Sequence, residues 1–185
     1  LAAQRHLLPS PVADAIGTLD IDRDVADLAD WLSKLLTAEP PSKAIIAFYF
    51  GIVDRAPSTG APPRSDLYLS GSDWFNPEDE DFEWAVDPAY FPDGRYAGSA
   101  VMAALDDLEQ RHNFGPRGFL TAMYALSAVH EIVRRVGPDL MLRAGKRGKV
   151  PGRGVAVGHD GGGAWLLGAI APEGWVRIDE IFEPG

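Results

Sequence analysis

Carboxylates and aromatic rings are interleaved between residues 73 and 91. Clustered acidic side chains create a strong local negative field, and aromatic rings offer rigid contact area of the kind that dominates protein interfaces. The segment predicts a docking surface for a basic protein partner; the alternative is that the rings face the core and the acids face water. The predicted contact residues are Asp73, Trp74, Phe75, Glu78, Asp79, Glu80, Asp81, Glu83, Trp84 and Tyr90. The run lacks the spaced D-x-D-x-D-G ligands of a calcium loop, so we expect no metal there.

His159 and Asp160 open a glycine-rich turn, HDGGG. A histidine close to a carboxylate can act as a base with its orienting partner, so these residues predict a ligand-binding pocket or the site of a small enzyme. The chain has no G-x-S-x-G motif to hold a serine nucleophile, and we predict no catalytic residue. The alternative is a hairpin turn, which favours Asp and Gly for conformational reasons alone.

Two further motifs match known functional patterns only in part. The helical stretch HEIVRR has Arg134 where a zinc protease needs a second histidine, four residues after His130. The basic, glycine-containing stretch from Arg143 to Arg153 suits an anion, but it lacks the G-x-x-x-x-G-K-[ST] pattern of a phosphate-binding loop. We expect a mobile surface loop there, or a contact with the acidic run within the chain or across a dimer.

The elements that must position these residues follow from periodicity and turn signals. Apolar residues at three- and four-residue steps predict an amphipathic helix from Asp20 to Thr37, capped by Asp20 or Asp22. The same spacing predicts helices over 97–112 and after Pro116, with one more helical turn after Pro138. Strands are predicted at Ala44–Val53, Asp66–Ser70, Phe82–Val86, Val155–Gly158, Ala164–Ile170 and Trp175–Ile181.

This order of elements predicts an α+β fold. Strands in two groups flank the helical pair, which argues against a regular βαβ alternation. We expect a mixed or mostly antiparallel sheet packed against two or three amphipathic helices, with a C-terminal β-meander. The 185 residues are expected to form one domain, with residues 1–19 as a loosely packed N-terminal extension.

Composition limits the classes of partner. There are 27 Asp and Glu against 17 Lys and Arg, and the net charge of −10 repels nucleic acid and anionic membranes. No apolar run approaches the roughly 20 residues that span a bilayer, and no continuous apolar stretch marks a signal peptide. The absence of cysteine excludes disulfides and thiolate chemistry. We therefore expect a cytoplasmic protein without a cofactor.

The order of the pieces, DLYLSGSDWFNPEDEDFEWAVDPAYFPDGRY, then two helices, then VAVGHDGGGAWLLGAIAPEGW, resembles the small α+β immunity proteins of bacterial polymorphic-toxin systems. The resemblance spans residues 43–181 and includes no diagnostic motif. It implies a non-enzymatic inhibitor that covers the active surface of a basic toxin, such as a nuclease or a deaminase. Two other hypotheses stay open: a small enzyme or ligand-binding domain around His159 and Asp160, and a structural homo-oligomer in which the acidic and basic segments meet.

Overall fold

The computed structural model describes residues 10–56, 63–113, 116–160 and 162–178 of the chain. Its helices are α1 (Ser10–Gly17), α2 (Ile21–Ala38), α3 (Ala100–His112) and α4 (Phe119–Met141). Its strands are β1 (Ala47–Arg55), β2 (Arg64–Ser72), β3 (Tyr96–Gly98), β4 (Arg153–His159), β5 (Ala164–Ala171) and β6 (Gly174–Arg177). Short 3-10 turns, η2 (Glu83–Ala85) and η3 (Gly145–Arg147), lie in the connections.

The strands form one sheet in the order β3-β2-β1-β4-β5-β6. Strands β1 and β4 are parallel, whereas the other neighbouring strands pair antiparallel. Strands β4, β5 and β6 form the predicted C-terminal meander. The last strand ends at Arg177, so Ile178 does not continue it as predicted, and residues 179–181 of the predicted strand lie outside the described residues. The sheet is therefore mixed, and the predicted α+β fold class is confirmed.

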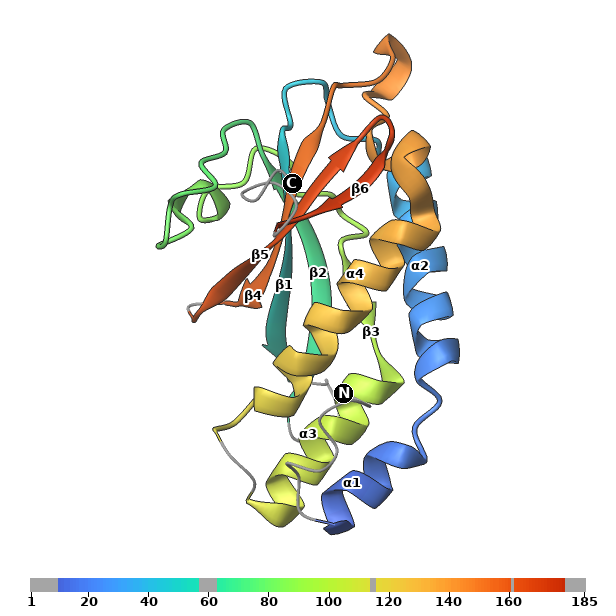
Figure 1. The fold of residues 1–185 in the computed structure, drawn as a ribbon, viewed down its shortest axis with the longest axis vertical. Coiled ribbons are helices and arrows are strands. Elements are labelled where there is room, and N and C mark those ends of the chain that lie inside the picture. The colour runs from blue at the N-terminus through green and yellow to red at the C-terminus, as the bar shows by residue number, and fades with distance from the viewer. Residues whose placement is uncertain (1–9, 57–62, 114–115, 161, 179–185) are drawn as a thin grey trace.

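The two faces of the sheet bury different side chains. Because residues alternate along a strand, Phe48 and Phe50 of β1 join the main core under the helices, whereas Tyr49 points to the opposite face. Figure 1 shows α2 and α4 along one side of the sheet, with the green segment between β2 and β3 on the other side. We call the side that carries Tyr49 and Tyr68 the open face, because no α-helix covers it in the described part of the chain.

Helix α2 matches its prediction closely. It begins after Asp20, whose side chain accepts a hydrogen bond of 3.2 Å from the Arg23 N–H. Its apolar stripe is buried against the sheet and the other helices. The turn predicted after Pro138 is also helical, and it continues α4 beyond a break at Gly137, where φ is 78° and ψ is 160°. The next residue, Pro138, lacks the N–H that a regular helix requires, and its ring disfavours helical backbone at the residue before it, which explains the break.

Two expectations about local structure were wrong. The predicted strand Phe82–Val86 is instead the η2 turn, in which Trp84 is buried. Its apolar and acidic residues alternate as in a strand, but a tight turn also places one ring inward and its neighbours outward. The N-terminal extension is not loose over its described part, because Val12 and Ile16 of α1 are 1% and 2% exposed in the core. Residues 1–9 of that predicted extension lie outside the described residues.

Among the described helices, none combines the length and the apolar character that a membrane crossing requires.

Candidate functional site

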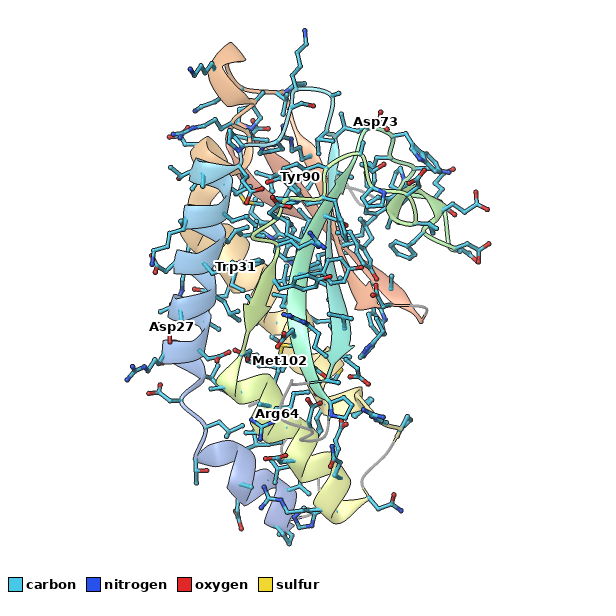
Figure 2. All side chains as sticks on the ribbon, turned by 180° about the vertical axis from the view of Figure 1, so that it is seen from behind. Asp27, Trp31, Arg64, Asp73, Tyr90 and Met102 are labelled. Atoms are coloured by element: carbon cyan, nitrogen blue, oxygen red, sulfur yellow. The ribbon has the colours of Figure 1, made fainter. Side chains whose placement is uncertain are left out.

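Residues 73–91 form a surface segment that is seated on the open face of the sheet. In Figure 2 the segment that begins at Asp73 lies on the side of the molecule away from α2, which carries Asp27 and Trp31. Two aromatic residues hold it there: Trp84 is 1% exposed, and the Phe75 ring packs edge-on against it at 5.1 Å between centroids. A Cβ on Gly154 of β4 would lie 2.5 Å from the Phe75 ring, so only glycine lets that ring approach the strand.

The acidic side chains of this segment face solvent. All but Asp79, which is half-buried, are exposed, and none of the eight ion pairs found among the described residues includes an acid of residues 73–91. Between these acids, Trp74 is 45% exposed and Phe91 is 49% exposed. We call residues 73–91 the acidic-aromatic surface.

The predicted docking residues divide into two groups. Asp73, Trp74, Glu78, Glu80, Asp81 and Glu83 are exposed, as a docking surface requires. Trp84 and Tyr90 instead anchor the segment, because Trp84 is buried and the Tyr90 hydroxyl donates a 2.5 Å hydrogen bond to the carbonyl oxygen of Glu39. Phe75 and Asp79 belong to neither group, because both are half-buried.

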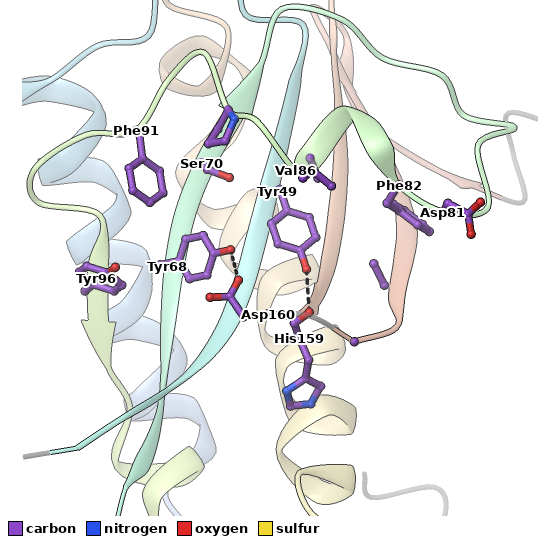
Figure 3. A pocket seen from close by; sticks show the side chains of 14 residues that line it. Tyr49, Tyr68, Ser70, Asp81, Phe82, Val86, Phe91, Tyr96, His159 and Asp160 are labelled. Carbon is purple, nitrogen blue, oxygen red and sulfur yellow. Dashed lines mark hydrogen bonds between the residues drawn. The ribbon is translucent and has the colours of Figure 1, made fainter.

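A cleft of about 490 Å³ lies between the acidic-aromatic surface and the open face. Its walls include the rings of Tyr49, Tyr68, Phe82, Phe91 and Tyr96. Asp81 reaches it from the acidic-aromatic surface, and His159 and Asp160 reach it from the end of β4 (Figure 3). The structure therefore brings together two regions that the sequence analysis treated as separate sites.

Tyr68 fixes the carboxylate of Asp160 at the cleft. The Tyr68 hydroxyl donates a 2.5 Å hydrogen bond to Oδ1 of Asp160, a residue 92 positions away in the sequence (Figure 3). The Tyr68 ring lies directly over Gly51 of β1, where an added Cβ would come within 2.0 Å of the ring. The lack of a side chain at Gly51 therefore creates the space in which Tyr68 reaches Asp160.

Tyr49 and Tyr68 keep their protons at neutral pH. Burial, and then the charge of Asp160, raises the pKa of Tyr49 to about 12. Burial and the hydrogen bond to Asp160 raise the pKa of Tyr68 well above its usual range. Both hydroxyls are therefore donors, and the Tyr49 hydroxyl donates a long 3.4 Å hydrogen bond to the carbonyl oxygen of His159.

These tyrosines predict a loss of stability at alkaline pH. From about pH 10 the tyrosines of the unfolded chain ionise, whereas Tyr49 in the folded chain keeps its proton until about pH 12. The unfolded state then binds fewer protons than the folded state, so the free energy of unfolding falls as the pH rises through this window. Urea unfolding measured at intervals across this window checks the slope, and Tyr49→Phe, which removes one of the shifted groups, is expected to reduce it. A wild-type slope of zero contradicts the prediction.

His159 and Asp160 do not form the predicted base and orienting pair. Figure 3 shows the His159 imidazole pointing away from the Asp160 carboxylate, and no hydrogen bond joins the two side chains in the described part of the chain. Adjacent residues at a strand end project in opposite directions, which accounts for this divergence. Asp160 belongs to the cleft through its carboxylate, whereas His159 contributes its backbone oxygen to Tyr49.

The basic stretch from Arg143 to Arg153 is anchored in the protein at its C-terminal residue, Arg153. Arg153 is 1% exposed, and its guanidinium donates hydrogen bonds to the carbonyl oxygens of Ser42, Ile45 and Met141. Lys149 forms an ion pair with Asp139. Arg153 therefore caps backbone carbonyls inside the protein, and it is not part of an exposed anion site.

His130, the histidine of the HEIVRR stretch, packs its ring edge-on against Trp175 at 5.7 Å between centroids.

Sequence reasoning missed most of the cleft wall. Tyr49, Tyr68, Phe91 and Tyr96 were not among the predicted contact residues. A signal for this wall exists in the strand sequences, because GVAVG at 154–158 alternates small residues with valines. A strand face of glycine and alanine leaves room for rings to lie on it, whereas the valines face the core.

Within the described ranges, no group of three or more histidine, aspartate or glutamate side chains is arranged to hold a metal ion. No family model matches this chain, and comparisons with curated proteins and with solved structures gave no match either.

Proposed function

We propose that this protein is a non-enzymatic binding protein that docks a basic protein partner on the acidic-aromatic surface. In this proposal it acts as an immunity-type inhibitor that blocks a basic toxin. The observation that carries the proposal is the set of exposed acids that form no ion pair with any other described residue, beside the exposed rings of Trp74 and Phe91. Like charges that are held close together repel one another, and a cationic partner relieves that repulsion.

The two kinds of side chain contribute to different parts of binding. Exposed carboxylates steer a basic partner to the surface and raise the association rate. Aromatic side chains bury large rigid areas at low entropic cost and lengthen the residence time. A surface that combines both therefore suits fast capture followed by slow release, which an inhibitor of a toxin requires.

Charge reversal at three exposed glutamates tests this proposal. We expect the Glu78→Lys, Glu80→Lys and Glu83→Lys triple variant to lower the association rate with the partner by about 10-fold or more, because steering is lost. These residues lie outside the cleft and their carboxylates make no hydrogen bond to another described residue, so the fold is preserved. The partner is first captured from native cells with the tagged wild-type chain, and its rate constants are then measured by surface plasmon resonance at several salt concentrations.

A matched triple variant controls for net charge. Asp14→Lys, Asp27→Lys and Asp30→Lys change the net charge equally, but they lie at exposed positions on α1 and α2, away from the acidic-aromatic surface. We expect this variant to bind at close to the wild-type rate. If both variants bind equally well, or if the partner is not basic, the acidic-aromatic surface is not the docking site.

A growth assay tests inhibition. The captured partner should arrest growth when it is expressed alone, and co-expression of the wild-type chain should restore growth.

A further inference from the structure

The cleft combines aromatic rings with carboxylates, and no lysine or arginine lines it among the described residues. Five rings form its walls, while Asp81 and Asp160 supply negative charge from opposite sides. Ring faces and carboxylates both attract cations and disfavour anions. The chemistry of this cleft therefore selects a positively charged group.

Asp160 is prepared to receive such a group. Its backbone N–H donates a 3.0 Å hydrogen bond to the carbonyl oxygen of Ile52, and its Oδ1 accepts the Tyr68 hydroxyl at 2.5 Å. Oδ2 accepts no hydrogen bond from any other described residue. The carboxylate is thus held in one orientation while one of its oxygens remains available to a ligand.

The rim of the cleft already shows how its rings accept a guanidinium group. The Cζ atom of Arg95 lies 3.8 Å from the centroid of Phe91 and 4.7 Å from that of Tyr96. The Cζ atom of Arg55 lies 4.5 Å from the Tyr96 centroid, and Arg55 is neutralised by Asp66 at 3.0 Å. These arginines are not among the residues that line the cleft, and no lysine or arginine of the described part of the chain lines it beside Tyr49, Tyr68 and Asp160.

From this arrangement we infer that the cleft binds the guanidinium group of an arginine side chain presented by the protein partner, an inference that rests on the proposed function. Arginine fits better than lysine because its planar group stacks on rings and forms directed hydrogen bonds to a carboxylate at the same time. An apolar side chain would desolvate Asp160 without replacing its interaction with water. The arginine would stack on Tyr68 and donate to Oδ2 of Asp160.

Peptide binding tests this assignment without the partner itself. The probes are a hexa-arginine peptide, a hexa-lysine peptide and a hexa-citrulline peptide, in which a neutral urea group replaces each guanidinium. We expect the affinity for the wild-type chain, measured by isothermal titration calorimetry, to fall in the order arginine, lysine, citrulline. Asp160→Asn keeps an oxygen acceptor for Tyr68 and removes the charge, so it should weaken hexa-arginine binding by about 10-fold or more.

Two further variants locate the binding site. Glu78→Gln removes one charge from the acidic-aromatic surface outside the cleft, and we expect a change of less than about 2-fold. Asp81→Asn removes the second carboxylate of the cleft and should weaken binding more than Glu78→Gln does. Urea unfolding of each variant confirms that the fold is retained.

The outcomes separate this inference from the proposed function. Equal losses in Asp160→Asn and Glu78→Gln would mean that the acidic-aromatic surface attracts the peptide diffusely, which overturns the cleft assignment and leaves the docking proposal standing. Equal binding of citrulline and arginine peptides, or no binding of hexa-arginine at millimolar concentration, also overturns it. Failure of the docking proposal is recognised separately, by a partner that binds the triple glutamate variant as well as it binds the wild-type chain.

Discussion

Replacing Trp84 with alanine is expected to lower the free energy of unfolding by about 3–5 kcal/mol, the usual cost of truncating a large aromatic residue in a core. Trp84 is 1% exposed and packs against Phe75 and Tyr49, with ring centroids 5.1 and 6.4 Å away. Its removal leaves a cavity between the η2 turn and the open face of the sheet. Urea unfolding monitored by circular dichroism measures the change.

Trp74 provides a control of the same residue type in the same segment. It is 45% exposed, so Trp74→Ala is expected to change the free energy of unfolding by less than about 1 kcal/mol. Because η2 positions Phe82 and Ala85 in the cleft wall, Trp84→Ala should also weaken binding of the hexa-arginine peptide. If the two tryptophan variants had equal stability, the segment would not be seated on the sheet through Trp84.

The second large effect is expected for Asp24→Ala, at about 3–5 kcal/mol of destabilisation. Asp24 of α2 is 6% exposed, and its carboxylate accepts hydrogen bonds from the hydroxyls of Ser99 and Tyr124, both at 2.6 Å. It also accepts the backbone N–H of Ala100 at 2.8 Å, at the start of α3. The substitution leaves these donors buried without an acceptor and removes a negative charge from a helix N-terminus.

Asp27 on the same helix is the matched control. Asp27 forms an ion pair with Arg23 at 3.9 Å, and both side chains are more than 70% exposed. Asp27→Ala should therefore cost less than about 1 kcal/mol. Thermal unfolding of both variants side by side distinguishes the two roles, and an Asp24→Ala variant as stable as Asp27→Ala contradicts the proposed role of Asp24 in joining α2, α3 and α4.

Local sequence determined most of the secondary structure. The apolar spacing of α2 and the short side chain of Asp20 fix that helix and its first turn, because both act within a few residues. The almost uninterrupted apolar run in AFYFGIV, rich in aromatic and β-branched residues, fixes β1 as a strand that is covered on both faces. Tyr49 falls on the open face because successive side chains of a strand point to opposite sides. The class of the fold followed from the order of these elements.

The alternation of rings and acids led to a wrong strand prediction at Phe82–Val86. This alternation indicates only which side chains are buried, and a 3-10 turn packed on the sheet produces the same burial pattern as a strand. Trp84 is buried by contacts that include the Tyr49 ring, whose position is far from residue 84 in the sequence, so local alternation does not distinguish the two. The short strand β3 was missed because three residues are too few to establish a period.

The cleft was decided by tertiary structure. Its key pair, Tyr68 and Asp160, meets because β4 lies parallel to β1, and β1 in turn pairs with β2. Strand order and register depend on how all the apolar faces are buried together, so no local pattern specifies which hydroxyl reaches which carboxylate. The sequence by itself determined most of the helices and strands and the acidic and aromatic side chains of residues 73–91, whereas only long-range packing joined that segment to Asp160 in one cation-attracting cleft.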